Sequence, residues 1–253
     1  MIDRKEYWNN DYFLYWQSRV KEANELAGNT SNMIQGDKKT LSDTVNQRTI
    51  DLLMIEPEDI VLEVGCGFGR NLENLPNAKI YACDISQSMI DEAEKNFPNV
   101  FFKVSEAEKT GYENSFFDKI ICIGTFDALY QKQALIEFNR ILKLSGAICI
   151  TGKNMRYKAD DDLAKEAEEN ARKKGHPNYF TDFRQLSDSV TDFGFSIVLQ
   201  LKFEYRGDFA EYKVSPTADE FYEYIIILEK TKDLHVTEAL PEISSKFSVH
   251  FKQ

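Results

Sequence analysis

Residues 61–70 read Val61-Leu62-Glu63-Val64-Gly65-Cys66-Gly67-Phe68-Gly69-Arg70 and are the most informative stretch of the chain. A short apolar run that ends in glycine is typical of a buried parallel strand. The glycines at 65, 67 and 69 predict a tight turn whose backbone can approach a ligand, because glycine has no Cβ. We expect a helix to follow over residues 69–75. A glycine-rich turn is also found in ordinary strand-to-helix connections. A ligand site is therefore inferred only if other parts of the sequence also indicate one.

Apolar runs and helical patterns alternate along most of the chain. The expected strands cover residues 60–64, 79–83, 100–104, 119–123, 147–151, 196–205 and 223–229. The expected helices, besides the one after the glycine turn, cover residues 5–26, 41–54, 86–97, 131–142, 160–174 and 181–193. Strands that alternate with helices predict an α/β fold with a parallel sheet and right-handed crossover connections.

The charge balance argues against nucleic acid as a partner. Lys and Arg number 31 and Asp and Glu number 42, so the formal net charge of the 253 residues is −11. A surface of this sign repels phosphate backbones. The four cysteines are widely spaced without a CxxC pair, which indicates reduced core residues and neither a metal site nor a disulfide framework.

The sequence does not predict membrane association. Its longest wholly aliphatic run, residues 225–228, is far shorter than the roughly 20 residues that span a bilayer. Residues 1–10 are charged and aromatic and lack the apolar centre of a signal peptide. Together with the cysteine pattern, these features predict a cytoplasmic location.

Two details of the glycine turn restrict the class of ligand that it can bind. Dinucleotide-binding turns follow the spacing GxGxxG, whereas here the spacing is GxGxG and Arg70 stands where the third glycine would be. Glu63 places a carboxylate at the strand end, where it would repel a pyrophosphate held at the start of the next helix. The turn therefore favours a phosphate-free ligand with positive charge.

The stretch Glu63-Val64-Gly65-Cys66-Gly67-Phe68-Gly69 resembles the first motif of class I S-adenosylmethionine-dependent methyltransferases. Further ordered matches lie in residues 80–86, 105–108, 114–120 and 140–147. The resemblance implies S-adenosylmethionine as cofactor and S-adenosylhomocysteine as product. It also implies a Rossmann-like, mostly parallel sheet of seven strands in the order 3-2-1-4-5-7-6, with helices on both faces.

The resemblance also assigns residues to the cofactor. Asp84 would bind the two ribose hydroxyls, although it could instead cap a helix. Ile85 would pack on the adenine, and Met89 could line the same pocket or belong to the core. Glu106 and the backbone of Ala107 would contact the adenine edge, although Glu106 could instead be a solvated loop acid. The implied cofactor site comprises Glu63, Gly65, Cys66, Gly67, Gly69, Asp84, Ile85, Met89, Glu106, Ala107, Ile123 and Gly124.

The acceptor side is expected from the N-terminal helix and an insertion between strands five and six. Tyr7 and Tyr12 could form a lid or contact the acceptor, or they could pack their helix on the sheet. Arg156, with Lys158 and Arg184, could contact an anionic acceptor or lie on an exposed face. Tyr179 lies at the exit of the insertion.

Two residues are candidates for a general base, and no metal ion is expected. His176 is the leading candidate because the imidazole pKa lies near neutrality, although it could be a solvated loop histidine. Asp127, directly after strand four, is the alternative.

The expected organisation has three parts. Residues 1–39 form a helical cap, residues 40–230 form the methyltransferase domain, and residues 231–253 form a C-terminal extension. The insertion of the middle part covers about residues 153–180 and would cover the acceptor site. A homodimer is a further expectation.

The predicted activity is methyl transfer to an O or N atom of a small molecule. A natural product, a sugar or a nucleotide-linked surface-glycan building block is expected by exclusion, because the charge disfavours RNA and DNA and no NPPY-type tetrapeptide follows strand four. One alternative is a catalytically silent regulatory or scaffold subunit of the same fold. Another is a nicotinamide-dependent oxidoreductase, against which Glu63 and Arg70 argue.

Overall fold

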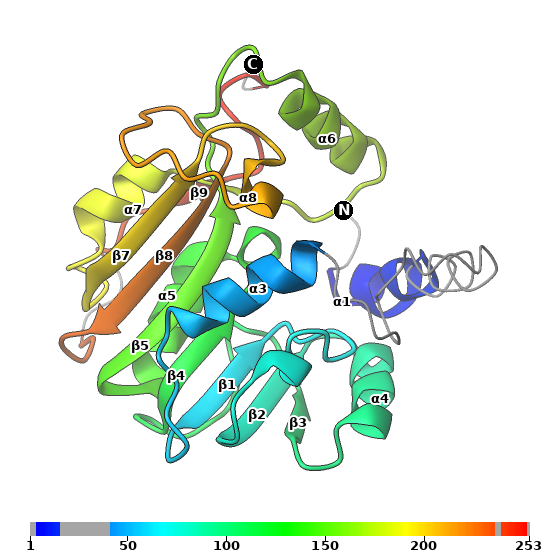
Figure 1. Cartoon of the computed structure of the whole chain (residues 1–253), viewed down its shortest axis with the longest axis vertical. Helices are drawn as coiled ribbons and strands as arrows, with labels where there is room; N and C mark the ends of the chain where they lie inside the picture. The colour runs from blue at the N-terminus through cyan, green and yellow to red at the C-terminus, as the bar shows by residue number, and fades with distance from the viewer. Residues whose placement is uncertain (1–3, 16–40, 236–238, 252–253) are drawn as a thin grey trace.

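The computed structural model describes residues 4–15, 41–235 and 239–251, and its centre is a seven-stranded sheet (Figure 1). The strands of this sheet are β1 (Ile60–Val64), β2 (Lys79–Asp84), β3 (Phe101–Val104), β4 (Phe117–Cys122), β5 (Leu142–Lys153), β7 (Phe195–Phe203) and β8 (Glu223–Lys230). They stand in the order β3-β2-β1-β4-β5-β8-β7. Numbered within this sheet alone, the order is 3-2-1-4-5-7-6, because β6 belongs to a separate two-stranded sheet. The predicted Rossmann-like α/β class is confirmed.

The strand directions bring the functional segments to one edge of the sheet. β1 to β5 pair in parallel, so the turns that follow β1, β2 and β4 leave the sheet at the same edge. β8 runs antiparallel to β5 and pairs its first residue, Glu223, with the last residue of β5, Lys153. The start of β8 therefore lies at the same edge as the glycine turn.

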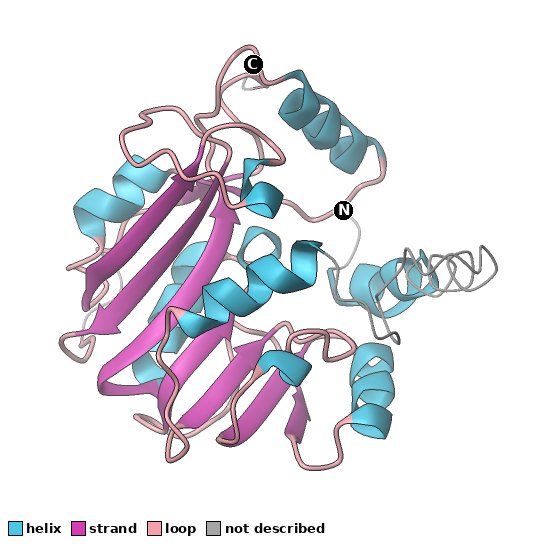
Figure 2. Cartoon of the chain, in the orientation of Figure 1, coloured by secondary structure: helices cyan, strands magenta, loops and turns pink. Residues whose placement is uncertain are grey.

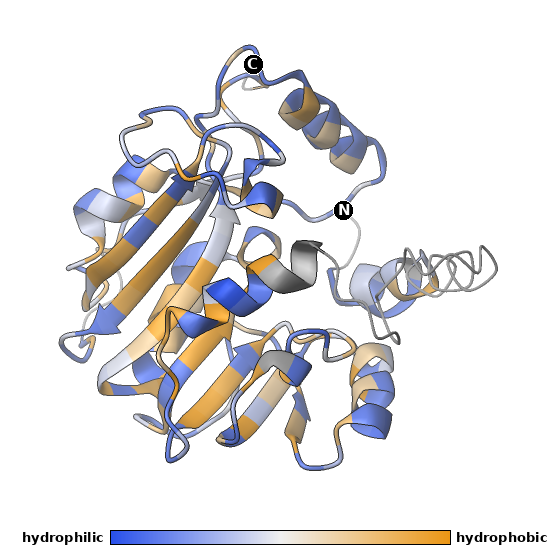
Figure 3. Ribbon diagram, in the orientation of Figure 1, coloured by the Kyte–Doolittle hydropathy of each residue, from blue (hydrophilic) through white to orange (hydrophobic). Residues whose placement is uncertain are grey.

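Helices cover both faces of the sheet (Figure 2). They are α3 (Leu41–Asp51), α4 (Gln87–Asn96), α5 (Gln131–Ile141), α7 (Phe183–Ser189) and α8 (Asp208–Glu211). A further helix, α6 (Asp162–Lys173), lies beyond the end of the sheet and packs with residues of the insertion (Figure 1). One apolar layer joins α5 and α7 to the sheet, and a second joins α3 and part of α4 to the opposite face. Figure 3 shows the apolar residues concentrated along the strands between these layers. Among the described residues, no helix has the length and apolar character that a membrane crossing requires.

The expected N-terminal helix is described over its first part. It comprises α1 (Arg4–Glu6), the π-helical turn η1 (Tyr7–Asp11) and further helical residues 12–15. The rest of the predicted helix, and most of the predicted cap of residues 1–39, lies outside the described residues.

The prediction of a helix over residues 69–75 is wrong. The chain instead makes turns and a short 3-10 helix, η2 (Leu72–Asn74). Gly69 has a φ of +90°, which no helical residue adopts, and Pro76 follows within two turns. Only the six residues between these two positions could be helical, and so short a helix is marginal without support from tertiary packing.

Two further elements differ from the predictions. β5 begins at Leu142 and not at residue 147, because Leu142 pairs with Phe117 across an irregularity in the ladder. The helix expected over residues 181–193 is shorter, since Thr181 belongs to β6 (Phe180–Thr181). Thr181 is fully buried, and its hydroxyl lies 2.7 Å from the Tyr224 hydroxyl, which fixes it beside the sheet.

The C-terminal segment packs on the insertion. β9 (Ser244–Ser245) pairs antiparallel with β6, and the Ser248 amide donates to the buried Glu168 carboxylate of α6 at 3.0 Å. Tyr157 also donates to Glu168, at 2.9 Å. The insertion and the segment after residue 239 therefore form one packed unit.

Candidate functional site

A cavity of about 510 Å³ opens at the edge of the sheet where the strands β1, β2, β4 and β5 end. Its volume lies in the range of roughly 300–1,000 Å³ that small-molecule sites occupy. The predicted cofactor residues that line it are Gly65, Cys66, Gly67, Asp84, Ile85, Met89, Glu106, Ala107, Ile123 and Gly124. Glu63 and Gly69 belong to the same turn but do not line the cavity.

The glycine turn needs its glycines for two different reasons. Gly65 has a φ of +68°, and a Cβ there would lie 2.2 Å from Cγ2 of Thr125. Packing against Thr125 therefore excludes any larger residue at this position. Gly67 has a φ of +53°, and a Cβ there would meet no heavy atom of the described residues within 4 Å. The backbone at Gly67 thus borders open cavity space, as a close approach to a ligand requires.

Asp84 connects the turn to the helix that follows β2. Its carboxylate accepts hydrogen bonds from the Gly67 and Ser86 amides, each at 2.9 Å. Burial raises the pKa of Asp84, while the bonds from the Ser86 and Gly67 amides act against the rise. The helix cap of α4 is Ser86, whose side chain accepts from the Met89 amide. Asp84 is therefore not needed as the cap, and its carboxylate borders the cavity.

Glu63 lies behind the turn. Its side chain is 2% exposed, and its Oε1 accepts a hydrogen bond from the Asn71 amide group at 2.9 Å. Its Oε2 is buried without a hydrogen-bond partner among the described residues. Burial raises the pKa of Glu63 to about 8. This corrects the expected position, because the carboxyl group lies behind the turn and does not line the cavity.

Asn71 and Asn46 line the cavity and were missed by the sequence reasoning. The Asn46 side-chain amide of α3 donates to Oδ1 of Asn71 at 2.8 Å, so a relay of two amides leads to Glu63. A single asparagine in a helix or a turn does not indicate a binding site in the sequence. Only the packing of α3 against the turn brings Asn46 and Asn71 together.

The N-terminal segment is fixed on both sides of the cavity. Arg4 donates to both carboxylate oxygens of Glu108, just after β3. Asn9 accepts from the amide and the hydroxyl of Ser88 at the start of α4, each at 3.1 Å. These bonds hold the segment against the cavity, which Arg4 also lines.

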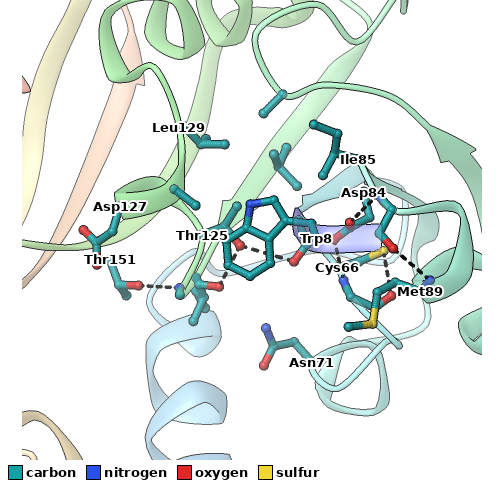
Figure 4. A pocket seen from close by; sticks show the side chains of 18 of the residues that line it. Trp8, Cys66, Asn71, Asp84, Ile85, Met89, Thr125, Asp127, Leu129 and Thr151 are labelled. Carbon is teal, nitrogen blue, oxygen red and sulfur yellow. Dashed lines mark hydrogen bonds between the residues drawn. The ribbon is translucent and has the colours of Figure 1, made fainter. Parts of the chain in front are cut away.

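Trp8 and Tyr12 line the cavity, whereas Tyr7 does not. Figure 4 draws the Trp8 indole between Asp84 and Met89 on one side and Asp127 and Thr151 on the other. Tyr7 is buried, and its hydroxyl lies 2.6 Å from Nδ1 of His176. Tyr12 thus borders the cavity, whereas Tyr7 packs against His176 and the neighbouring rings of Trp8 and Tyr12.

His176 lines the cavity beside the aromatic cluster. The Trp8 and Tyr7 rings meet its imidazole edge-on, at centroid distances of 5.1 and 5.3 Å. Burial, together with the positive charges of Lys153 and Lys174, lowers the pKa of His176 to about 4. The imidazole is therefore neutral at neutral pH.

Asp127, the other predicted base, lines the cavity but is engaged by Lys153. The Lys153 amide donates to Oδ1 at 2.8 Å, and its ammonium lies 3.0 Å from Oδ2. The ion pair raises the pKa of Lys153 against the opposing effect of burial. Lys153 and Glu223 also line the cavity, and the sequence reasoning missed both. They are 70 positions apart, and only the register of β5 and β8 joins them.

Two predicted acceptor contacts lie away from this cavity. Arg156 lines a separate cavity of about 500 Å³, together with Lys158, Arg184 and Glu204. Tyr179 packs against the ring of Tyr130, with a centroid distance of 5.7 Å.

The four cysteines are all buried and unpaired. Burial raises the pKa of Cys83 to about 12 and also raises that of Cys66, so both thiols of the cavity are protonated. In the part of the chain that the structure describes, no three His, Cys, Asp or Glu side chains gather in a way that could hold a metal ion.

Comparisons with known proteins agree with this arrangement. A family model described as "Methyltransferase domain" matches residues 62–150, which run from β1 to β5. An uncharacterized protein of Methanocaldococcus jannaschii is 38% identical over 110 residues, which cover 43% of each chain. The demethylmenaquinone methyltransferase of Chlorobaculum tepidum is 31% identical over 101 residues, which cover 38% of this chain and 41% of the enzyme. The matches thus span about two fifths of these relatives.

A solved structure extends the likeness to most of the fold. The geranyl diphosphate C-methyltransferase of Streptomyces coelicolor, crystallised with Mg²⁺, geranyl diphosphate and S-adenosylhomocysteine, superposes with a TM-score of 0.60. The match covers 75% of this chain and 79% of that enzyme at 12% sequence identity. At this identity the likeness concerns the fold alone.

The cavity fits S-adenosylmethionine by its own chemistry. Asp84 offers a carboxylate that suits a diol, and Gly67 leaves a space that a Cβ would fill. The buried Glu63 carboxyl, which burial keeps mostly protonated, would be favoured to ionise by a cation bound in the neighbouring cavity. The family model identifies residues 62–150 as a methyltransferase domain, and the seven-stranded fold and this donor set are those expected of class I S-adenosylmethionine-dependent methyltransferases.

Proposed function

We propose that the protein transfers a methyl group from S-adenosylmethionine to an O or N atom of a small molecule. The observation that carries the proposal is the lining of a single cavity. Asp84 and Glu106 border it after β2 and β3, whereas Lys153, His176 and Glu223 border it from β5, the insertion and β8. A nucleoside at the first group would leave the second group for an acceptor.

Several residues of this chain would hold the cofactor, which supplies an electrophilic methyl group on a cationic sulfur. Asp84 would accept hydrogen bonds from the ribose hydroxyls, and Glu106 and the Ala107 amide would contact the adenine edge. Ile85 and Met89 would cover the faces of the ring. All five border the cavity.

The N-terminal segment would exclude water from the reacting groups. Trp8 and Tyr12 border the cavity, and Arg4 and Asn9 fix their segment on two sides. Closure of a site by a segment of this kind strengthens the electrostatic interactions inside and prevents side reactions.

The narrower expectations stay predictions. These are the sugar, natural-product or glycan-precursor acceptor, the absence of a nucleic-acid partner, the homodimer and the cytoplasmic location. The catalytically silent alternative keeps the same cofactor site, so only turnover distinguishes it from an enzyme.

Calorimetry with S-adenosylmethionine and with NAD tests the cofactor, and an assay for S-adenosylhomocysteine with a metabolite library tests turnover. We expect binding of S-adenosylmethionine and not of NAD. NAD binding without S-adenosylmethionine binding would refute the proposal. Tight binding of S-adenosylmethionine without product from any acceptor would favour the silent subunit.

A further inference from the structure

Glu223 is a carboxylate at the acceptor end of the cavity that the sequence reasoning did not identify. As the first residue of β8 it pairs with Lys153, the last residue of β5, and both line the cavity. The nucleoside-binding positions lie after β2 and β3, and β1, β4 and β5 separate those strands from β8 in the sheet order. Glu223 therefore belongs to the part of the cavity that the cofactor's nucleoside would leave open.

The Glu223 side chain is not engaged by a neighbour. Its carboxylate makes no hydrogen bond or ion pair with any residue in the described ranges 4–15, 41–235 and 239–251. The nearby Lys153 ammonium is paired with Asp127 at 3.0 Å. Two carboxylates and one ammonium thus share this end of the cavity, which leaves one excess negative charge when Glu223 is ionised.

Each of the other two candidate bases is engaged by a neighbouring residue. Both oxygens of Asp127 accept from Lys153, at 2.8 and 3.0 Å. The Nδ1 atom of His176 lies 2.6 Å from the Tyr7 hydroxyl, inside the aromatic cluster. Of the two carboxylates that line this end of the cavity, Glu223 is the one without a hydrogen bond or ion pair among the described residues.

We propose that Glu223 binds the protonated amino group of a small primary or secondary amine and takes its proton, which makes such amines the acceptor class. The inference rests on the proposed function, because it assigns the acceptor for the same cavity. An excess negative charge favours a cation over an alcohol, and aromatic rings such as those of Trp8 and Tyr224 border the same space.

The chemistry balances with the groups present. One N–H bond of the ammonium breaks, its electron pair stays on nitrogen, and the proton forms an O–H bond with the Glu223 carboxylate. The nitrogen lone pair then forms a bond to the methyl carbon while the carbon–sulfur bond of the cofactor breaks and its electron pair stays on sulfur. The methylated amine leaves, and Glu223 returns its proton to water.

The electrostatic surroundings of Glu223 suit this role. Burial raises the pKa of Glu223 to about 7, Asp127 and Asp161 act in the same direction, and Lys153 and Arg206 act against it. A base needs a pKa near the working pH to accept a proton and release it again. Because Glu223 must be ionised to accept the proton, kcat/KM should fall as the pH drops below about 7.

A matched pair of probes tests the binding step without turnover. Benzylamine and benzyl alcohol have nearly the same shape but differ in charge, and each is titrated by calorimetry into the protein loaded with S-adenosylhomocysteine. We expect benzylamine to bind roughly tenfold or more tightly than the alcohol, and Glu223→Gln to abolish that preference. Glu229→Gln, on the same strand but outside the cavity lining, is the matched control and should retain it.

Turnover provides the second readout. We expect the wild type to form S-adenosylhomocysteine when it is given amines. The Glu223→Gln variant should keep its cofactor affinity but be much less active, and its residual kcat/KM should no longer fall near pH 7. Equal binding of the two probes, an unchanged preference in Glu223→Gln, or turnover of alcohols alone would overturn the assignment of Glu223. If the wild type does not bind S-adenosylmethionine, the proposed function itself is wrong.

Discussion

The substitution Glu63→Gln isolates the cost of a buried carboxylate beneath the glycine turn. Glu63 is 2% exposed, accepts one hydrogen bond from Asn71, and leaves Oε2 without a partner among the described residues. Glutamine has the same shape and keeps an oxygen to accept from Asn71. The change therefore removes a titratable charge without opening a cavity.

The magnitude follows from the pKa. Burial raises the pKa of Glu63 from 4.5 to about 8, and each tenfold change in proton affinity corresponds to about 1.4 kcal/mol, so the full effect is roughly 5 kcal/mol. Below the unfolded pKa both states are protonated and the native state bears no penalty. As the pH rises from about 4.5 to about 8, the unfolded chain loses its proton while the native chain keeps it, so the native state loses stability.

Urea unfolding of the wild type and Glu63→Gln over this pH range measures the effect. We expect the variant to be more stable than the wild type by an amount that grows with pH and reaches roughly 3 kcal/mol at pH 7. Glu73→Gln, which changes an exposed carboxylate in the same connection, is the control and should follow the wild-type pH dependence. Comparing variants at each pH cancels the titration of all other groups.

Two parallel stability curves, or a difference that shrinks as the pH rises, would refute the assignment of a raised pKa to Glu63. The cofactor supplies a further check. A cation bound in the neighbouring cavity stabilises the ionised form of Glu63, so S-adenosylmethionine should release protons on binding near neutral pH, and Glu63→Gln should reduce that release. Calorimetry in buffers of different ionisation enthalpy measures it.

The remaining predictions concern three other positions. Asp84→Ala should abolish detectable S-adenosylmethionine binding in calorimetry, because it removes both the diol acceptor and the anchor of the Gly67 amide; unchanged affinity would contradict the placement of the cofactor. His176→Ala should lower kcat through loss of its contact with Tyr7 but keep the pH dependence near neutrality, and loss of that dependence would make His176 the base after all. Arg4→Ala should speed S-adenosylmethionine dissociation in stopped-flow measurements several-fold, since Arg4 fixes the N-terminal segment to Glu108, whereas an unchanged rate would exclude a closing role for the segment.

The order of elements along the chain was predictable because it rests on local patterns. Apolar runs that end in glycine or acid predicted the parallel strands, and the spacing of three glycines predicted the turn at which the cavity lies. The same reasoning failed where backbone conformation overrode a pattern. Gly69 at a φ of +90° and the nearby Pro76 prevented the helix that the sequence predicted there.

Most of the residues that the sequence assigned to the cofactor line one cavity, because they follow consecutive strands and lie close to them in sequence. Glu63 and Gly69 do not line it, and Asn46 and Asn71 were missed. The acceptor side could not be predicted in this way, because its charge balance depends on strand register. Lys153 and Glu223 meet only because β8 runs antiparallel to β5 and begins where β5 ends.

The sequence by itself thus determined the sheet, the glycine turn and the methyltransferase motifs of residues 62–150, since each rests on residues that are neighbours along the chain. Only the tertiary structure decided which acids carry free charge. Asp127 is paired with Lys153, Glu63 is covered by the turn, and Glu223 faces the cavity without a partner in the described residues. The physical reason is that burial and pairing set the protonation of a carboxylate, and both are properties of contacts between distant parts of the chain.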